Sequence, residues 1–199
     1  MTKKIYLLLD CETTGLNPDI HALLSFCCVA FAVKENSKEL EIVKEMLDIP
    51  AIIPNSGTLT MDIAAMEINK IDIVAHAKKS IRTAEAATMI EKYILELKQK
   101  YPSAVIMPAG HNLNSLDIPI MKKILPSWSK EISHRTYDTC SVACALQLAG
   151  RIPQSNNLSL AQVCECFGVK VLDHHTAKGD VLMTFELITE LTKVLNQSQ

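Results

Sequence analysis

The chain has 199 residues, 48% of them hydrophobic, and a formal net charge of −2. This length and apolar content suit one well-buried core, so we expect residues 1–199 to form a single domain. The near-neutral charge and the lack of blocks of like charge argue against a protein that coats nucleic acid or binds a membrane through basic residues. A nucleic-acid substrate that is gripped only at its terminus is compatible with this charge.

The hydrophobic pattern, taken in chain order, predicts an α/β fold. Residues 5–9, 23–33 and 40–47 are typical of strands, and the short polar loop at 34–38 makes the last two an antiparallel pair. Residues 50–80 predict irregular structure with short helical pieces. Helices are expected from 83 to about 101, 115 to 125, 138 or 139 to 150, 159 to 168 and 176 to 195, and short strands at 104–107 and 135–137. This order indicates a mixed sheet with helices around it.

The sequence also indicates a cytoplasmic protein that does not enter a membrane. The apolar stretch before Asp10 is too short for the core of a signal peptide, and no run of about 18 apolar residues occurs. The seven cysteines are an odd number and have no secretory context, which favours reduced thiols in the cytoplasm. Neither the pair Cys140 and Cys144 nor the pair Cys164 and Cys166 has a zinc-knuckle spacing, and we interpret these four as small core residues rather than metal ligands.

Asp10 and Glu12 follow the first predicted strand and are one residue apart. Because side chains alternate along a strand, both carboxylates are expected on the same side. Two neighbouring negative charges repel each other unless a cation lies between them, so the pair favours a divalent ion with oxygen ligands. The alternative interpretation is a surface turn after an edge strand.

Two further acids lie on the apolar side of predicted helices. Asp117 shares a face with Ile120, Met121 and Ile124, and Asp180 shares one with Met183, Leu187 and Leu191. A carboxylate that faces a core must be hydrogen-bonded, paired or bound to metal. For either residue alone, compensation of the helix dipole is a competing explanation.

His175 is expected in the loop just before the last helix, near Asp180. A histidine beside a carboxylate cluster can take a proton from a bound water, because its ordinary pKa lies near neutral pH. His174 is a rival for the same role, and a structural role is the alternative for a lone histidine.

Three segments together resemble the motifs of the DEDDh 3'-5' exonucleases, the superfamily of polymerase proofreading subunits, RNase T and oligoribonuclease. The segments are Asp10-Cys11-Glu12-Thr13-Thr14-Gly15-Leu16, His111-Asn112-Leu113-Asn114-Ser115-Leu116-Asp117 and His175-Thr176-Ala177-Lys178-Gly179-Asp180. Asp138-Thr139 is similar to an accessory feature of the family. The resemblance covers residues 5 to 190, and three motifs in order are a specific signal.

The resemblance implies a ribonuclease-H-like fold, with a mixed five-stranded sheet flanked by helices and an antiparallel second strand. It implies hydrolysis of phosphodiester bonds at the 3' end of single-stranded DNA or RNA, with release of nucleoside 5'-monophosphates. By the same resemblance, Asp10, Glu12, Asp117 and Asp180 would hold two divalent ions, Mg²⁺ or Mn²⁺, and His175 would be the general base. Thr13, Leu16 and Asn112 would contact the substrate.

Several alternatives stay open at this point. The spacing of Asn112 from Asp117, the leucine at 116 and the lack of a glutamate after Leu24 differ from the commonest family pattern and leave the choice between DNA and RNA open. A homodimer or an association with a polymerase is compatible with the resemblance. The alternative function is a non-catalytic module that binds nucleic acid or a polymerase through an exonuclease fold.

Overall fold

The computed structural model of the chain describes residues 3–171 and 174–196. At its centre is a five-stranded sheet in the order β3-β2-β1-β6-β7. The strands are β1 (Lys4–Thr13), β2 (Leu23–Val33), β3 (Leu40–Ile49), β6 (Val105–Gly110) and β7 (Tyr137–Asp138). β2 runs antiparallel to β1 and β3, whereas β1, β6 and β7 are parallel to one another. The predicted mixed sheet with an antiparallel second strand is confirmed.

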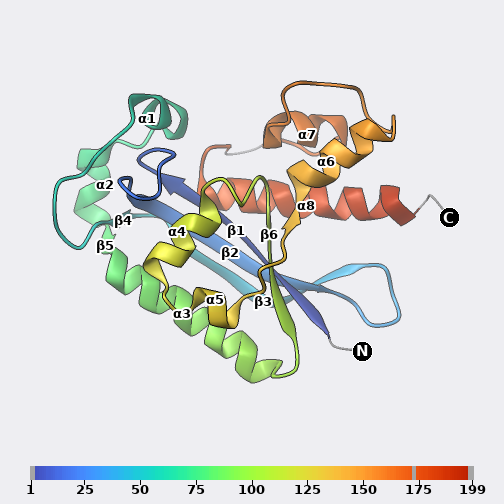
Figure 1. The fold of residues 1–199 in the computed structure, drawn as a ribbon, viewed down its shortest axis with the longest axis horizontal. Helices are drawn as coiled ribbons and strands as arrows, with labels where there is room; N and C mark the ends of the chain where they lie inside the picture. The colour runs from blue at the N-terminus through green and yellow to red at the C-terminus, as the bar shows by residue number, and fades with distance from the viewer. Residues whose placement is uncertain (1–2, 172–173, 197–199) are drawn as a thin grey trace.

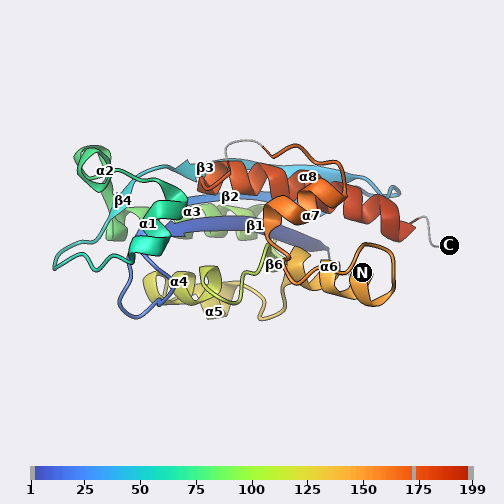
Figure 2. The same ribbon diagram turned by 90° about the horizontal axis from the view of Figure 1, so that it is seen from above.

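Helices cover both faces of this sheet (Figures 1 and 2). They are α1 (Ile63–Asn69), α2 (Ile73–Lys79), α3 (Thr83–Lys100), α4 (Asp117–Ile124), α5 (Trp128–Glu131), α6 (Thr139–Leu148), α7 (Leu160–Cys166) and α8 (Ala177–Asn196). Figure 2 shows α8 on one side of β1 and α4 and α5 on the other. The last helix therefore approaches the central strand from the side opposite to α4.

Because side chains alternate along β1, alternate residues of this strand lie on opposite faces of the sheet. Ile5, Leu7, Leu9 and Cys11 are buried in the core beneath α3, α4 and α5. Leu8 belongs to the other core, which α8 covers with Ala177, Val181 and Ile188. Continuing this alternation, Asp10 and Glu12 share the α8 face with Leu8, which positions them to meet the first turn of α8.

Residues 50–82 form an arm beside the end of β1. It contains the short helices α1 and α2, as predicted for this irregular segment, and a small parallel pair of strands that was not predicted, β4 (Ile52–Ile53) and β5 (Ile81–Arg82). Two hydrogen bonds tie α1 to the segment after β1: the Asp62 N–H donates to the Thr14 carbonyl at 2.7 Å, and Asn69 Nδ2 donates to the Thr13 carbonyl at 3.1 Å. The arm is thereby attached at the strand end that carries the acidic pair.

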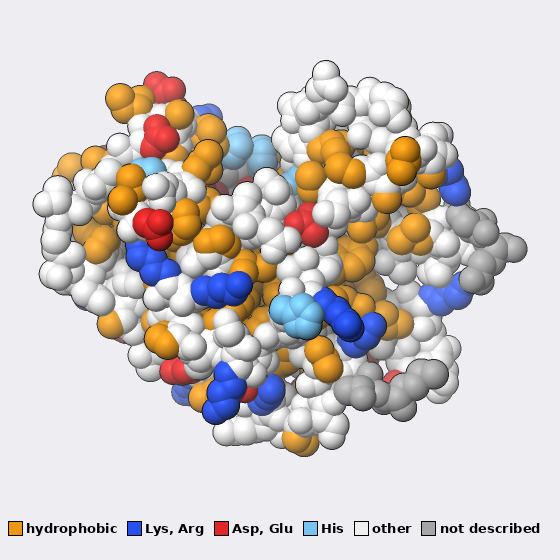
Figure 3. All heavy atoms as spheres, viewed as in Figure 1, with side chains coloured by type: hydrophobic (Ala, Val, Ile, Leu, Met, Phe, Trp, Pro, Cys, Tyr) orange, Lys and Arg blue, Asp and Glu red, His pale blue; other side chains and the backbone are white. Residues whose placement is uncertain are grey.

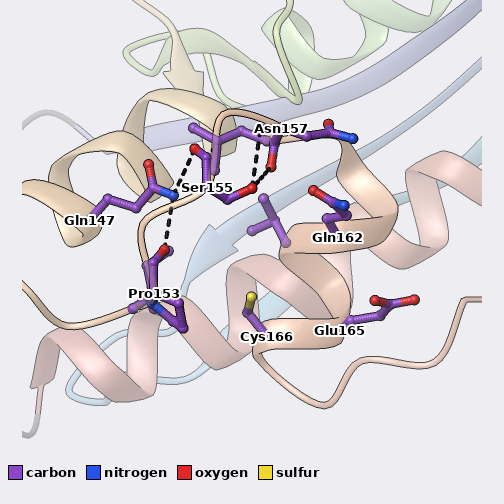
Figure 4. A pocket seen from close by; sticks show the side chains of 10 residues that line it. Gln147, Pro153, Ser155, Asn157, Gln162, Glu165 and Cys166 are labelled. Atoms are coloured by element: carbon purple, nitrogen blue, oxygen red, sulfur yellow. Dashed lines mark hydrogen bonds between the residues drawn. The ribbon is translucent and has the colours of Figure 1, made fainter.

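The loop between α6 and α7 is held by Gln147, which is buried (Figure 4). Its Nε2 donates to the carbonyls of Pro153 and Ser155, at 3.0 and 3.2 Å. The loop borders a cavity of about 370 Å³, and Leu158 lies on its wall. The same loop leads to Leu158, whose backbone carbonyl contacts His111 of the candidate active site described below.

The predicted element order is confirmed, but some boundaries differ. β1 continues to Thr13, so the acidic pair lies inside a central strand and not in a turn after an edge strand. α4 begins at Asp117 rather than at residue 115 because residues 111–116 form a loop, in which Asn112 has a positive φ of 58°. None of the helices in the described ranges is long and apolar enough to cross a membrane.

Candidate active site

Asp10 and Glu12 project from the end of β1 that lies beyond its pairing with β6. The parallel pairing with β6 stops at Leu8 and Ala109, whereas the antiparallel pairing with β2 continues, with Asp10 opposite Cys27 and Glu12 opposite Ser25. The chain leaves β6 at Gly110, where a Cβ atom would lie 2.4 Å from the Leu113 side chain. Only glycine permits this close turn, and the turn leaves the side of β1 free for the loop that carries Asp117.

Asp180 reaches the acidic pair from the first turn of α8. The Asp180 N–H donates to the Thr176 carbonyl at 2.9 Å, and the Gly179 N–H donates to the Thr176 hydroxyl at 3.0 Å, so Thr176 organises the start of the helix. Carboxylate oxygens of Asp10, Glu12 and Asp180 all lie within 4.8 Å of one another. Three of the four predicted acids therefore converge.

Asp117 is buried at the first residue of α4 and lies close to the same group. Its carboxylate accepts a hydrogen bond from the Cys11 thiol. Its charge contributes to raising the pKa values of both Asp10 and Glu12, which places the fourth acid within electrostatic range of the first two. Cys11 is buried in the core and also contacts this site carboxylate. The prediction that Cys140, Cys144, Cys164 and Cys166 are core residues holds for the buried Cys164 but is wrong for Cys144 and Cys166, which are exposed.

Burial and like charge together raise the pKa values of this cluster. Burial has the largest effect on Asp10, followed by the charges of Asp117, Asp180 and Glu12, and its pKa lies well above the ordinary value. Burial and the charges of Asp180 and Asp117 raise the pKa of Glu12 to about 7. Burial raises the pKa of Asp117 to about 7, although the Cys11 hydrogen bond acts in the opposite direction. Such a cluster is unfavourable when fully ionised and requires compensating positive charge.

The donor set fits hard divalent cations. Each of the four side chains offers carboxylate oxygens, the ligands that Mg²⁺ and Mn²⁺ prefer. The three oxygens of Asp10, Glu12 and Asp180 are close enough to share one ion after small adjustments. The repulsion expressed in the raised pKa values is what a bound cation would relieve.

Both candidate histidines lie beside Asp180 in the loop before α8. His174 Nδ1 is 2.8 Å from Asp180 Oδ1, and the rings of His174 and His175 stack with their centroids 3.7 Å apart. His175 has a positive φ of 70°. Its pKa is lowered by burial first and then by His174, while Asp180 acts against this shift. The structure places both candidate histidines at the site, and His174 contacts Asp180 directly.

The three predicted substrate residues differ in how they are placed. Leu16 is 73% exposed at the tip of the segment after β1, and Asn112 is exposed in the loop before α4. Thr13 is buried, and its hydroxyl donates to the Gly15 carbonyl at 2.8 Å, so this side chain is engaged within the protein. Figure 3 shows a notch between the α1 region and the α6 and α7 region, with histidine side chains in it.

One residue that supports the site was not predicted as part of it. Asp138 is buried at the end of β7, and its carboxylate accepts the backbone N–H groups of Asn112 and Leu113 at 3.0 and 2.9 Å. It also caps α6. An aspartate just before a predicted helix indicates a helix cap. Because capping alone accounts for an aspartate at this position, the sequence gives no sign of its second contact, with the Asn112 loop.

His111 links this loop to the α6–α7 segment. Its Nε2 is 2.7 Å from the Leu158 carbonyl, which can only accept, so Nε2 carries a proton. Its Nδ1 is 2.8 Å from the Thr139 hydroxyl. Burial lowers the pKa of His111. Both ring nitrogens are thus occupied by the fold, and His111 is a structural member of the site.

Comparisons with known proteins agree with this geometry. The model of the family described as exonuclease (RNase_T) matches residues 7–188. No curated protein sequence matches the chain significantly. Among solved structures, the zinc-bound complex of E. coli exonuclease I with single-stranded DNA is similar, at 18% identity and a TM-score of 0.74, over 97% of this chain and 41% of that one.

Two further complexes of E. coli exonuclease I are similar to the chain. The complex with a dT13 oligonucleotide has 18% identity and a TM-score of 0.72, over 96% of this chain and 41% of that one. The complex with a 5cy-dA13 oligonucleotide has 19% identity and a TM-score of 0.73, with the same coverage. The chain spans less than half the length of these proteins, and at this identity the likeness establishes a shared fold. Because the family model covers nearly the whole chain and the motif residues meet at one strand end, the chain belongs to the exonuclease family.

Proposed function

We propose that this protein is a metal-dependent 3'-5' exonuclease that hydrolyses the terminal phosphodiester bond of a single strand and releases nucleoside 5'-monophosphates. The observation that carries the proposal is the convergence of Asp10, Glu12 and Asp180 within 4.8 Å, in a chain that belongs to the exonuclease family. A phosphodiester brings further negative charge to this cluster. Hydrolysis there therefore needs cations that the four carboxylates can hold.

The cofactors in this proposal are two divalent ions, Mg²⁺ or Mn²⁺, held by Asp10, Glu12, Asp117 and Asp180. When bound, such ions neutralise the charge of the phosphate, lower the pKa of a water and stabilise the departing oxygen. The protein supplies a rigid set of oxygen donors from β1, α4 and α8. Because the donors come from three elements, loss of any one acid leaves the other three in place.

His175 is proposed as the general base. Its ring lies in the loop before α8, beside Asp180, and its lowered pKa keeps it neutral and able to accept a proton at pH 7 and above. The Lys70 charge contributes to this shift, which places the end of the α1 arm near the histidine. The arm and the α8 loop would thus border the same reacting group.

Leu16, Asn112 and the Thr13 backbone are proposed to contact the terminal nucleotide. Leu16 is exposed beside the site, where an apolar side chain can pack against a base. Single-stranded DNA is the first substrate to test, because the similar E. coli exonuclease I structures are described as complexes with single-stranded DNA and oligonucleotides. Recognition of a 2'-hydroxyl would instead mark an RNA enzyme.

We further propose that the protein works in the cytoplasm. The odd number of cysteines, seven, without secretory context supports a reducing compartment. Homodimerisation and association with a polymerase are the partner arrangements that the family resemblance suggests. Light scattering of the purified protein, alone and with a polymerase, distinguishes a monomer from either assembly.

The test is a degradation assay with 5'-labelled single-stranded DNA, duplex DNA, RNA and dinucleotides, each with Mg²⁺ or Mn²⁺. We expect stepwise shortening from the 3' end and release of 5'-monophosphates. Asp10→Ala and Asp180→Ala should abolish turnover, whereas Glu35→Ala, in the exposed β2–β3 loop, should not. His175→Ala should lower the rate by about 10²- to 10⁴-fold and still bind Mn²⁺. No shortening of any substrate by the folded wild-type protein would refute the proposal.

A further inference from the structure

A second group of potential metal ligands overlaps the acidic cluster. Nitrogen atoms of His174 and His175 and an oxygen of Asp180 all lie within 4.8 Å of one another. The Asp180 side chain is 12% exposed and that of His174 is 23% exposed, so solutes can reach the group. Its donors are two imidazoles and one carboxylate, in contrast to the all-oxygen set of Asp10, Glu12 and Asp180.

The backbone explains why two consecutive histidines can act together. In extended backbone, neighbouring side chains point to opposite sides. His175 instead has a φ of 70°, and the His174 and His175 rings stack at 3.7 Å with an interplanar angle of 28°. A non-glycine residue in this conformation is uncommon and is found preferentially at functional sites. The left-handed residue thus presents both rings to Asp180.

We propose that His174, His175 and Asp180 form a site for a borderline transition-metal ion such as Zn²⁺. Two histidines and one carboxylate are a common protein ligand set for zinc, with water in the fourth position. Mg²⁺ selects oxygen ligands instead, so the two groups prefer different metals although they share Asp180. The site is defined by His174, because His175 and the acids already have roles in the proposed exonuclease chemistry.

The alternative is that His174 serves only as a hydrogen-bond donor to Asp180. The distance of 2.8 Å between His174 Nδ1 and Asp180 Oδ1 fits such a bond. Ligand atoms about 2.0 Å from a tetrahedral zinc ion are about 3.3 Å apart, so binding requires only a small separation of the two side chains and loss of the shared proton. The two interpretations differ in whether the imidazole itself is needed.

A metal at this site would inhibit the proposed exonuclease. It would occupy the proton-accepting nitrogen of His175 and draw Asp180 away from the Asp10 and Glu12 carboxylates. This consequence rests on the proposed function, whereas the existence of the site does not. The binding experiment is therefore designed without an activity readout, so that failure of one proposal does not decide the other.

The experiment is a titration of the metal-free protein with Co²⁺ in saturating Mg²⁺, followed by visible absorption and then by competition with Zn²⁺. Co²⁺ with nitrogen and oxygen ligands in a four-coordinate site absorbs far more strongly than octahedral Co²⁺ on carboxylates and water. We expect one equivalent of strongly absorbing Co²⁺ that Zn²⁺ displaces. A sulfur-to-metal band in the near ultraviolet would place the ion on cysteines and overturn the proposal.

Four variants make the result specific. His174→Asn keeps a hydrogen-bond donor near the Nδ1 position but removes the imidazole, and His174→Ala removes both; each should weaken Zn²⁺ binding by about a hundredfold or more, since even loss of an outer partner costs tenfold or more. Asp10→Asn should retain the signal, as should the exposed-histidine control His134→Ala. Wild-type-like binding by folded His174→Asn, or loss of the signal in Asp10→Asn, would overturn the site. Far-ultraviolet circular dichroism establishes that each variant is folded.

Discussion

The side-chain carboxylate of Asp138 holds the backbone of Asn112: Asp138 Oδ1 accepts the Asn112 N–H at 3.0 Å, and Oδ2 accepts the neighbouring Leu113 N–H at 2.9 Å. The same Oδ1 accepts the Cys140 N–H at 2.9 Å and so caps α6. One buried carboxylate therefore joins the end of β7 to the loop that leads to Asp117. Asn112 is in the left-handed region, with φ 58°, and this bond helps to hold it there.

Replacing Asp138 with asparagine should destabilise the protein and weaken its catalysis. Asparagine can keep one acceptor but turns an NH₂ group toward a backbone N–H, which leaves a buried donor unsatisfied at a cost of about 1–3 kcal/mol. Urea unfolding measures the loss, and kcat of the folded variant measures the displacement of the Asp117 loop. Asp72→Asn is the matched control, since Asp72 caps only α2 and is exposed. Equal effects of the two variants on stability and kcat would contradict a role beyond capping.

The acidic core of the site was predictable from the sequence because each acid combined a charge with an apolar setting. Asp10 and Glu12 followed a strand-like run, and Asp180 preceded a core stripe in α8, whose Met183, Leu187 and Leu191 are indeed buried. The spacing of apolar residues along a strand or helix is a local property, so the sequence alone indicates which positions face the core. The fold class and the exonuclease family followed from the same residues and are confirmed.

The supporting contacts were not predictable, because they join residues far apart in sequence. Asp138 contacts Asn112 across 26 positions, and Asn69 contacts Thr13 across 56. Nothing in the local pattern around Asp138 distinguishes a cap from a cap with a second partner. The stacking of His174 on His175 depends on a backbone conformation that a non-glycine residue rarely adopts. Such features arise from the folded arrangement as a whole.

The metal-free protein should lose stability as the pH rises. Folding raises the pKa of Glu12 from 4.5 to about 7 and that of Asp117 from 3.8 to about 7. The folded state therefore binds these protons more tightly than the unfolded chain does. The stability that the two protonated carboxyl groups contribute is complete below about pH 4 and is lost as the pH rises from about 4 to 8. In EDTA, the Tm should fall by several degrees from pH 6 to pH 8, since about 1 kcal/mol corresponds to 2–4 °C at this size.

Saturating Mn²⁺ should reduce or reverse this pH dependence, because the ion replaces the protons as the positive partner of the carboxylates. Glu12→Gln should weaken the dependence of the Tm on pH in the metal-free protein. Glu85→Gln, an exposed acid in the first turn of α3, is the control and should leave it unchanged. A metal-free Tm that rises steadily from pH 6 to pH 8 would show that the carboxylates do not repel one another in the folded state.

Gly15→Ala should distort the segment that carries Leu16. A Cβ atom at Gly15 would lie 2.2 Å from the ring of His21, which is buried and accepts the Asn17 N–H at Nδ1. The ring must move, and the resulting overpacking should cost about 1–3 kcal/mol. Chemical denaturation of the two single variants and of Gly15→Ala/His21→Ala gives the coupling between the two sites. The alanine at 15 should cost less once the ring is absent, and purely additive effects would exclude the clash as the cause.

Leu16→Ala should weaken substrate binding without lowering stability. The side chain is 73% exposed, so its truncation removes little packing from the fold. If Leu16 packs against the terminal base, its loss removes contact worth about 1–3 kcal/mol, which corresponds to a rise in KM or a fall in kcat/KM of roughly 5- to 150-fold. Leu148→Ala is the matched control, because Leu148 is 90% exposed on α6.

Steady-state kinetics on a single-stranded oligonucleotide, together with the Tm of each variant, distinguish the effect of Leu16→Ala from that of Leu148→Ala. Equal kcat/KM values for Leu16→Ala, Leu148→Ala and the wild-type protein would remove Leu16 from the proposed substrate site and leave Asn112 and Thr13 as the proposed contacts of the terminal nucleotide.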